Sequence, residues 1–248
     1  MAGALQLGCS TVDSISARQA QTHRDLGSVY LGQGKIELAI REYQSSLELD
    51  DRDAETWFAM GEAYRRKGRF PEAEKYLRRA LELDDGKQDA RLNLSAMYLQ
   101  QGRWQEAITE AQILVDDPTF LVPARALVNL GFAQYKSGDL EGARQSLTRA
   151  LETNGSSYQA HADLGMVAYD QGEWVEAASQ FRMALRILEG RPKQVFGQIE
   201  AEIRFRMAMA QVRLGQRERA LDELRISASR GGQSEWGRKS RDYLAILE

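Results

Sequence analysis

Apolar side chains recur along the chain in short runs with helical spacing, and a glycine follows several of these runs. Leu26 to Leu31 is one such run, and Gly34 comes shortly after it. Apolar residues three or four positions apart predict an amphipathic helix with one buried face. A glycine just beyond the run predicts that the helix ends there in the left-handed conformation, which glycine adopts readily. We therefore expect a helix, a tight turn and a second helix.

A glycine followed five residues later by an alanine occurs six times. The steps between successive glycines are 34, 34, 36, 34 and 43 residues. A period of this length is typical of proteins in which one helical hairpin stacks on the next. The sequence therefore predicts six units, marked by Gly34/Ala39, Gly68/Ala73, Gly102/Ala107, Gly138/Ala143, Gly172/Ala177 and Gly215/Ala220.

The alanine of each pair is expected where the second helix crosses the first, because a small side chain lets two backbones approach closely. Tyr30, Tyr64 and Tyr98 are expected to fill the space beside this crossing. A larger side chain follows four residues after the alanine in five of the units, and we expect it in the core. These side chains are Tyr43, Leu77, Leu147, Phe181 and Leu224.

The second unit carries the clearest motif, Trp57-x-x-Met60-Gly61-x-x-Tyr64 followed by Ala73, Leu77 and Ala80. This resembles the tetratricopeptide repeat. The resemblance implies an all-α fold, a right-handed superhelical solenoid of helix-turn-helix repeats. Residues 20–234 divide into repeats at 20–53, 54–87, 88–121, 124–157, 158–191 and 201–234. Residues 235–248 carry apolar side chains at helical spacing and predict a capping helix over the last repeat.

The composition argues against several classes of function. The chain has 33 Lys and Arg against 36 Asp and Glu, a formal charge of -3, which argues against a nucleic-acid-binding protein. It has one cysteine and two histidines, and none of the common phosphate-loop, nucleophile-elbow or zinc-protease motifs. We expect no enzyme, no metal, no cofactor and no small-molecule substrate.

A partner-binding groove is expected on the first helices of the later repeats, which form the concave face in proteins that resemble this one. Contiguous exposed apolar surface usually marks a binding site for an extended or helical peptide. The alternative for each residue is that it packs against the neighbouring repeat and contacts no ligand. The predicted groove residues are Leu92, Leu99, Val128, Phe132, Tyr135, Met166, Tyr169, Phe205, Met209 and Val212.

In the first two repeats, the first-helix positions that correspond to the predicted groove are mostly polar. These repeats also carry basic residues interspersed with Glu62, Glu72 and Glu74, which we interpret as a solvated face in which opposite charges offset one another. The alternative is a patch that binds acidic partners. These basic residues are Arg65, Arg66, Lys67, Arg69, Arg78 and Arg79.

The N-terminus has a different character. Residues 1–8 are small and mostly apolar, and Cys9 begins a polar stretch. This resembles the junction at which a bacterial lipoprotein is cut and its cysteine is acylated. We interpret residues 1–19 as a signal-peptide remnant, the acylation cysteine and a tether. The alternative is an inert cysteine in a frayed tail.

Six repeats, Cys9, the longer third step and the run Ala124 to Gly131 together resemble the type IV pilus pilotin family, the PilF- and PilW-like outer-membrane lipoproteins. The resemblance implies an assembly factor that binds the PilQ-type secretin, the outer-membrane pore through which the pilus passes, and promotes its insertion and multimerisation. It also implies lipid anchoring to the outer membrane through Cys9, with the repeats facing the periplasm. The alternative is a general protein-protein interaction scaffold in the cytoplasm or periplasm.

Overall fold

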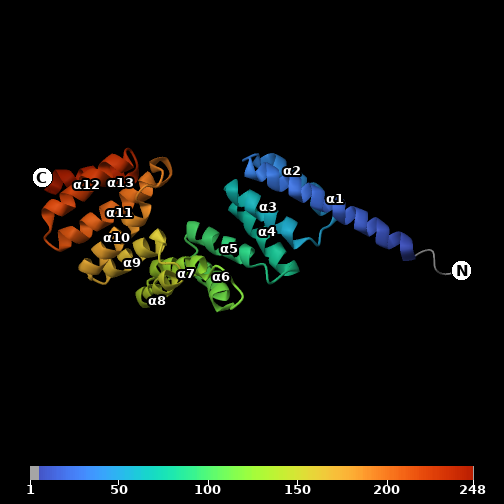
Figure 1. The fold of residues 1–248 in the computed structure, drawn as a ribbon, viewed down its shortest axis with the longest axis horizontal. Helices are drawn as coiled ribbons and strands as arrows, with labels where there is room; N and C mark the ends of the chain where they lie inside the picture. The colour runs from blue at the N-terminus through green and yellow to red at the C-terminus, as the bar shows by residue number, and fades with distance from the viewer. Residues whose placement is uncertain (1–5, 248) are drawn as a thin grey trace. The chain divides into compact units, whose positions relative to one another are not determined.

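The computed structural model describes residues 6–247, with side chains from Ile15 onward. Thirteen α-helices and no strand occur in this part of the chain, which confirms the all-α expectation. Two compact units divide within α6, one extending to Glu110 and the other beginning at Ala111. Figure 1 shows both as antiparallel helices joined by short turns.

The first unit contains five whole helices and the start of a sixth. They are α1 (Gln6–Gly32), α2 (Ile36–Leu49), α3 (Ala54–Arg66), α4 (Phe70–Leu83), α5 (Gln88–Gln100) and α6 (Trp104–Asp116). Within it, α1 packs against α2 and α3 packs against α4. The hairpins therefore follow the order of the predicted repeats.

The second unit continues from the end of α6. Its helices are α7 (Pro123–Ser137), α8 (Leu140–Thr153), α9 (Tyr158–Asp170), α10 (Trp174–Leu188), α11 (Lys193–Arg213), α12 (Arg217–Gly231) and α13 (Glu235–Leu247). Here α7 packs on α8, α9 on α10 and α11 on α12, while α13 packs on both α12 and α11. The last helix thus covers the final hairpin.

Two first helices are longer than the repeat boundaries suggest. Helix α1 begins at Gln6, and α11 begins at Lys193 rather than at residue 201. Pro192 occupies the position just before α11, where its missing backbone N–H leaves no helical hydrogen bond unmade. The extra residues between the fifth and sixth repeats therefore lengthen a helix and do not form a long loop.

The six repeat glycines have the predicted backbone conformation. Their φ angles lie between 71° and 92°, in the left-handed region. Gly138, for example, is the C-cap of α7, and its N–H donates to the Gln134 and Tyr135 carbonyls. These glycines end the first helix of each hairpin, as expected.

The crossing of the two helices in each hairpin is as close as the sequence predicts. All six repeat alanines are fully buried, and so are Leu77, Leu147 and Leu224. A second small residue, on the first helix, completes the contact. The side chain of Leu147 lies so close to Gly131 that a β-carbon added there would be 2.6 Å from the Leu147 Cγ. The same holds for Gly27 with Tyr43, Gly61 with Leu77 and Gly165 with Phe181.

Buried hydroxyls link the two helices of the first and of the last hairpin at equivalent positions. Ser46 donates to the Ala20 carbonyl at 2.8 Å, and Ser227 donates to the Ala201 carbonyl at 2.7 Å. Ser240 of α13 donates to Ser227 at 2.7 Å. Because a buried hydroxyl without a partner is costly, these bonds fix how α13 sits on the last hairpin.

We predict that Gly131→Ala destabilises the protein by about 1 kcal/mol. Overpacking against Leu147 costs about 1–3 kcal/mol, which exceeds the gain of about 1 kcal/mol in helix propensity. Gly197→Ala is the control, since Gly197 is also buried in a helix but a β-carbon there meets its nearest atom at 3.6 Å. The control should leave stability unchanged or raise it. Urea unfolding midpoints measure both, and equal midpoint losses would show that the close contact is not what requires glycine.

Candidate functional site

A cavity of about 180 Å³ opens in the second unit among α7, α9, α10 and α11. Five of the predicted groove residues line it, and they come from the first helices of three successive hairpins. They are Tyr135, Met166, Tyr169, Phe205 and Met209, joined by Phe181, Asp170 and Arg206. Part of the predicted groove is therefore a real concavity, with an apolar lining and two charged groups at its edge.

The other predicted groove residues lie outside this lining. Phe132 is next to it, with its ring 6.5 Å from that of Tyr135. Val128 packs against the core around Leu147, and Val212 is exposed near the end of α11. Leu92 and Leu99 lie on α5 in the first unit, where Leu92 is buried. The side chain of Cys9 lies outside the described residues.

The lining residues differ in how much surface they offer a ligand. Met166 and Phe205 are 7% and 8% exposed, so they form the wall and present only an edge. Tyr135, Tyr169 and Met209 are half-buried and present more of their side chains. These three are the residues that a partner would contact most.

The capping helix α13 holds one wall of the cavity in place. The ring of Phe205 lies 5.5 Å from Trp236 and 5.4 Å, edge to face, from Tyr243. The Arg206 guanidinium lies 5.1 Å from the centre of the Trp236 ring. Aromatic and cation-π contacts of this kind favour one orientation of each partner. Helix α13 therefore orients Phe205 and Arg206 as well as covering the last hairpin.

The polar edge of the cavity is already hydrogen-bonded. The Tyr135 hydroxyl donates to the Asp170 Oδ2 at 2.9 Å. Burial, and this bond to a carboxylate, raise the pKa of Tyr135 to about 12. Arg206 donates to the Glu202 Oε1 at 2.8 and 3.0 Å. These hydrogen bonds hold the Asp170 carboxylate and the Arg206 guanidinium in fixed orientations at the cavity mouth.

Asp163 lies on α9 and is only 9% exposed. Burial raises the pKa of its carboxyl to about 8, and the negative charge of Glu202 adds to this effect, while Arg206 and Lys136 oppose it. A carboxyl with such a pKa is largely protonated at neutral pH. It can then donate as well as accept a hydrogen bond.

The sequence predicted five of the lining residues as groove residues, but not Asp170, Arg206 or Phe181. Asp170 and Arg206 lie on the same first helices as the predicted residues. They were missed because only apolar side chains were taken as groove candidates. Phe181 was predicted, but as a core residue of the second helix.

The cavity is small and mostly apolar. No group of three or more His, Cys, Asp or Glu in the described residues could hold a metal ion. None of the helices in that stretch is both long and apolar enough to cross a bilayer. A cavity of this size, below the roughly 300–1,000 Å³ of small-molecule pockets, fits one large side chain of a partner.

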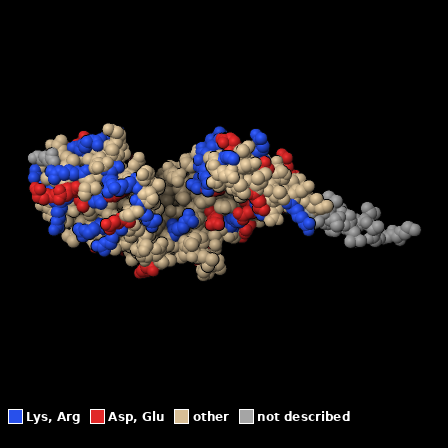
Figure 2. Space-filling view, turned by 45° about the horizontal axis from the view of Figure 1, so that its top comes forward, with Lys and Arg blue, Asp and Glu red and all other residues tan. Residues whose placement is uncertain are grey.

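The basic residues of the first unit carry opposite charges beside them, which confirms the solvated-face interpretation. Figure 2 shows blue and red side chains adjacent to one another over this unit. Glu62 binds both Arg65 and Arg66 at 2.8 Å, and Lys67 lies 3.3 Å from Glu37. The remaining pairs are Arg69 with Glu72, Arg78 with Glu74 and Arg79 with Glu82.

Helical hairpins of this length, with small residues at both crossing positions, define a class of repeat protein that binds other proteins. The tetratricopeptide repeat family matches residues 24–87, 58–119 and 124–192. The chain belongs to this family. A comparison with curated proteins gives no match.

Several solved structures share the fold. PilW, described as a widely conserved type IV pilus biogenesis factor, superposes with a TM-score of 0.77 at 18% identity, over 89% of this chain and 97% of that one. PilF of Pseudomonas aeruginosa gives 0.76 at 17% identity, over 92% and 99%. MamA from Desulfovibrio magneticus RS-1 gives 0.64 at 21% identity, over 70% and 97%. At these identities the similarity is one of fold.

We predict that Asp163→Asn stabilises the protein more strongly as pH rises from about 4 to about 8. In the folded state the carboxyl of Asp163 has a pKa of about 8, against 3.8 ordinarily. Between these values the folded chain binds more protons than the unfolded chain, so this group lowers the free energy of unfolding as pH increases, by up to about 1.4 kcal/mol per pH unit. The Asn variant escapes this loss. Urea unfolding across the pH range measures the difference between variant and wild type.

The control is Asp242→Asn, which changes an exposed carboxyl on α13. Its difference from wild type should stay flat over the same pH range. A flat difference for Asp163→Asn as well would show that Asp163 is ionised in the folded protein at neutral pH.

Proposed function

We propose that this protein is a type IV pilus assembly factor, a pilotin that binds the secretin and promotes its outer-membrane insertion and multimerisation. The observation that supports this most is the extent of the similarity to PilW and PilF. The shared fold spans about nine-tenths of this chain and nearly all of both structures. The match to MamA covers 70% of this chain, so the similarity there is less complete.

The cavity in the second unit supplies the contact for a secretin segment in this proposal. Tyr135, Tyr169 and Met209 offer large, half-buried side chains around a concavity that fits one apolar side chain. Such contacts tend to dominate binding free energy, because a buried anchor loses contact with water while the surrounding residues exclude it. The polar groups at the mouth, Asp170 and Arg206, would set the direction in which the segment lies.

Attachment to the membrane is proposed to occur through lipid on Cys9. Two or three acyl chains hold a protein to a bilayer far more firmly than one. The repeats would then face the periplasm, where the secretin subunits are assembled. Without lipid, the same fold would serve as a general scaffold for two other proteins. Palmitate labelling of the wild type and of Cys9→Ala separates these possibilities.

We predict that Tyr169→Ala together with Met209→Ala abolishes secretin multimers while the protein stays helical. Truncating one such anchor costs about 2 kcal/mol, or about thirtyfold in Kd. The readout is the amount of heat-resistant secretin multimer, with circular dichroism and melting temperature of the purified variant alongside.

The matched control is Val175→Ala with Val195→Ala, which removes apolar side chains that are 71% and 65% exposed on the same unit. Multimers should form normally with this pair. If the control pair abolishes multimers and the cavity pair does not, the secretin binds elsewhere on the protein.

We predict that Cys9→Ala moves the protein from the outer-membrane fraction to the soluble fraction without unfolding it. Metabolic labelling with radiolabelled palmitate should mark the wild type and leave the variant unlabelled. An unlabelled wild type that still binds the secretin would rule out the lipid anchor. An unlabelled wild type without secretin binding would favour the general scaffold.

A further inference from the structure

A second and larger concavity, of about 970 Å³, lies in the second unit among α10, α11 and α12. It shares no lining residue with the smaller cavity around Tyr135, Tyr169 and Met209, which we call the aromatic cavity. Glu200, Arg204, Met207 and Gln211 form its floor along α11, at helical spacing. Residues 205, 206 and 209, which line the aromatic cavity, fall on the opposite face of that helix. We call this second concavity the basic groove.

The charge of the basic groove is predominantly positive. Seven Arg or Lys line it, against four Asp or Glu. On the floor, Arg204 binds Glu200 at 2.9 Å and Glu223 at 2.6 Å, and Arg230 lies 3.3 Å from Glu200. These pairs offset Glu200 and Glu223. The other two carboxylates, Glu189 and Asp222, share the rim with the five remaining cations. The excess positive charge therefore lies on the rim.

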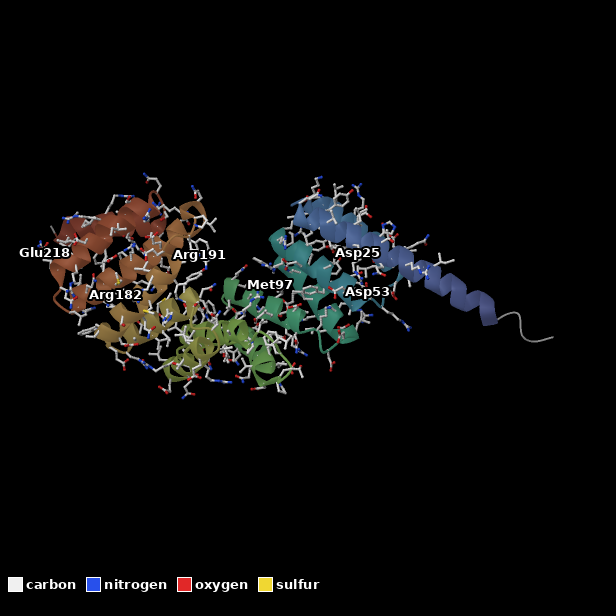
Figure 3. All side chains as sticks on the ribbon, viewed as in Figure 1. Asp25, Asp53, Met97, Arg182, Arg191 and Glu218 are labelled. Carbon is white, nitrogen blue, oxygen red and sulfur yellow. The ribbon has the colours of Figure 1, made fainter. Side chains whose placement is uncertain are left out.

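The rim cations are exposed and lack acidic partners. Arg182 and Arg186 lie one turn apart on α10, and Lys193 begins α11. None of the three makes an ion pair within the part of the chain that the structure describes. Arg219, on the opposite wall, donates to the Gln216 side-chain oxygen, Oε1, at 3.3 Å. Figure 3 labels Arg182 and Arg191, both of which line this groove in the second unit.

This rim differs from the basic surface of the first unit, where each cation has a carboxylate beside it. Arg182, Arg186 and Lys193 instead present unneutralised charge around a concavity. The first turn of α11 also carries no acidic residue, so the positive end of its dipole adds to the field there. An anionic ligand is the complement of this surface.

Gln211 indicates what kind of anion fits. Its side chain is only 4% exposed and lines the groove, and its Oε1 has no hydrogen-bond partner among the described residues. A buried acceptor of this kind is costly unless a donor reaches it. A peptide supplies backbone N–H donors together with carboxylates, whereas a phosphodiester supplies acceptors alone. The mixed lining, with Leu185, Leu188 and Met207 among the charges, also suits a peptide.

We infer that the basic groove binds an acidic peptide segment of a partner protein, at a site distinct from the aromatic cavity. Carboxylates of the segment pair with Arg182, Arg186 and Arg219, since arginine binds carboxylates with two parallel hydrogen bonds. On binding, the Gln211 side chain turns toward the groove, so that its Oε1, buried and unpaired in the free protein, accepts a hydrogen bond from a backbone N–H of the segment. The floor pairs around Arg204 keep the groove open and are not displaced.

The test measures binding of a fluorescein-labelled peptide of alternating Glu and Gly to the full chain, by fluorescence anisotropy at low salt. Arg182→Ser with Arg186→Ser should weaken binding at least about tenfold, because two charge-assisted hydrogen-bonding groups are lost. Gln211→Met should weaken it several-fold without changing the charge. The matching peptide of Gln and Gly should bind at least about tenfold more weakly than the Glu peptide.

The control is Arg125→Ser with Arg149→Ser, which removes the same charge from exposed positions on α7 and α8. Affinity should stay within about twofold of wild type. Circular dichroism confirms that each variant is folded, and Lys193→Ser provides a second, single test of the rim. The proposal is overturned if the Arg182 and Arg186 pair binds the Glu peptide as wild type does, or if single-stranded DNA or phosphatidylglycerol vesicles displace the peptide more effectively than unlabelled peptide does.

Discussion

The fold depends on one close contact that recurs in four of the hairpins. A small residue on the first helix lets a large side chain of the second helix pack directly on its backbone, as Leu147 does on Gly131. The repeat alanine on the second helix is fully buried, and its small side chain lets the first helix approach the backbone of the second. Because close packing is short-ranged, this geometry fixes the distance and rotation between the helices. The surfaces of the first helices that do not take part in this contact are thereby fixed in position, and residues on them line most of the aromatic cavity.

Helix α11 shows how a single helix can serve two surfaces. Phe205 and Met209 line the aromatic cavity, while Arg204 and Gln211 face the basic groove. Its mixture of charged and apolar residues on every side reflects these two demands. A helix at the surface of a globular core would instead have one polar and one apolar side. The second unit thus offers two chemically different surfaces within one hairpin and its neighbours.

Much of the fold could be predicted from the sequence, because the constraints that define it are local. Glycines with positive φ and alanines at the crossings recur at a fixed step, and both roles are confirmed. The candidate site was predicted only in part. Tyr135 and Tyr169 were named, but Asp170 was not, since a carboxylate is recognisable as part of an apolar cavity only once its hydrogen bond from Tyr135 is seen. The basic groove could not be predicted, because its charge depends on which arginines form ion pairs. The sequence does not distinguish Arg204, which is paired, from Arg182, which is not paired with any of the described residues.

The packing of α13 on Phe205 ties the aromatic cavity to the end of the array. In a linear repeat protein the terminal element has a neighbour on one side only, so it opens at a lower free energy than the middle. Trp236 and Tyr243 hold the Phe205 ring from this terminal helix. Local opening of α13 therefore loosens one wall of the cavity before the rest of the unit unfolds. A ligand seated against Phe205 would slow amide hydrogen exchange in α13, a helix that contributes no residue to the cavity lining.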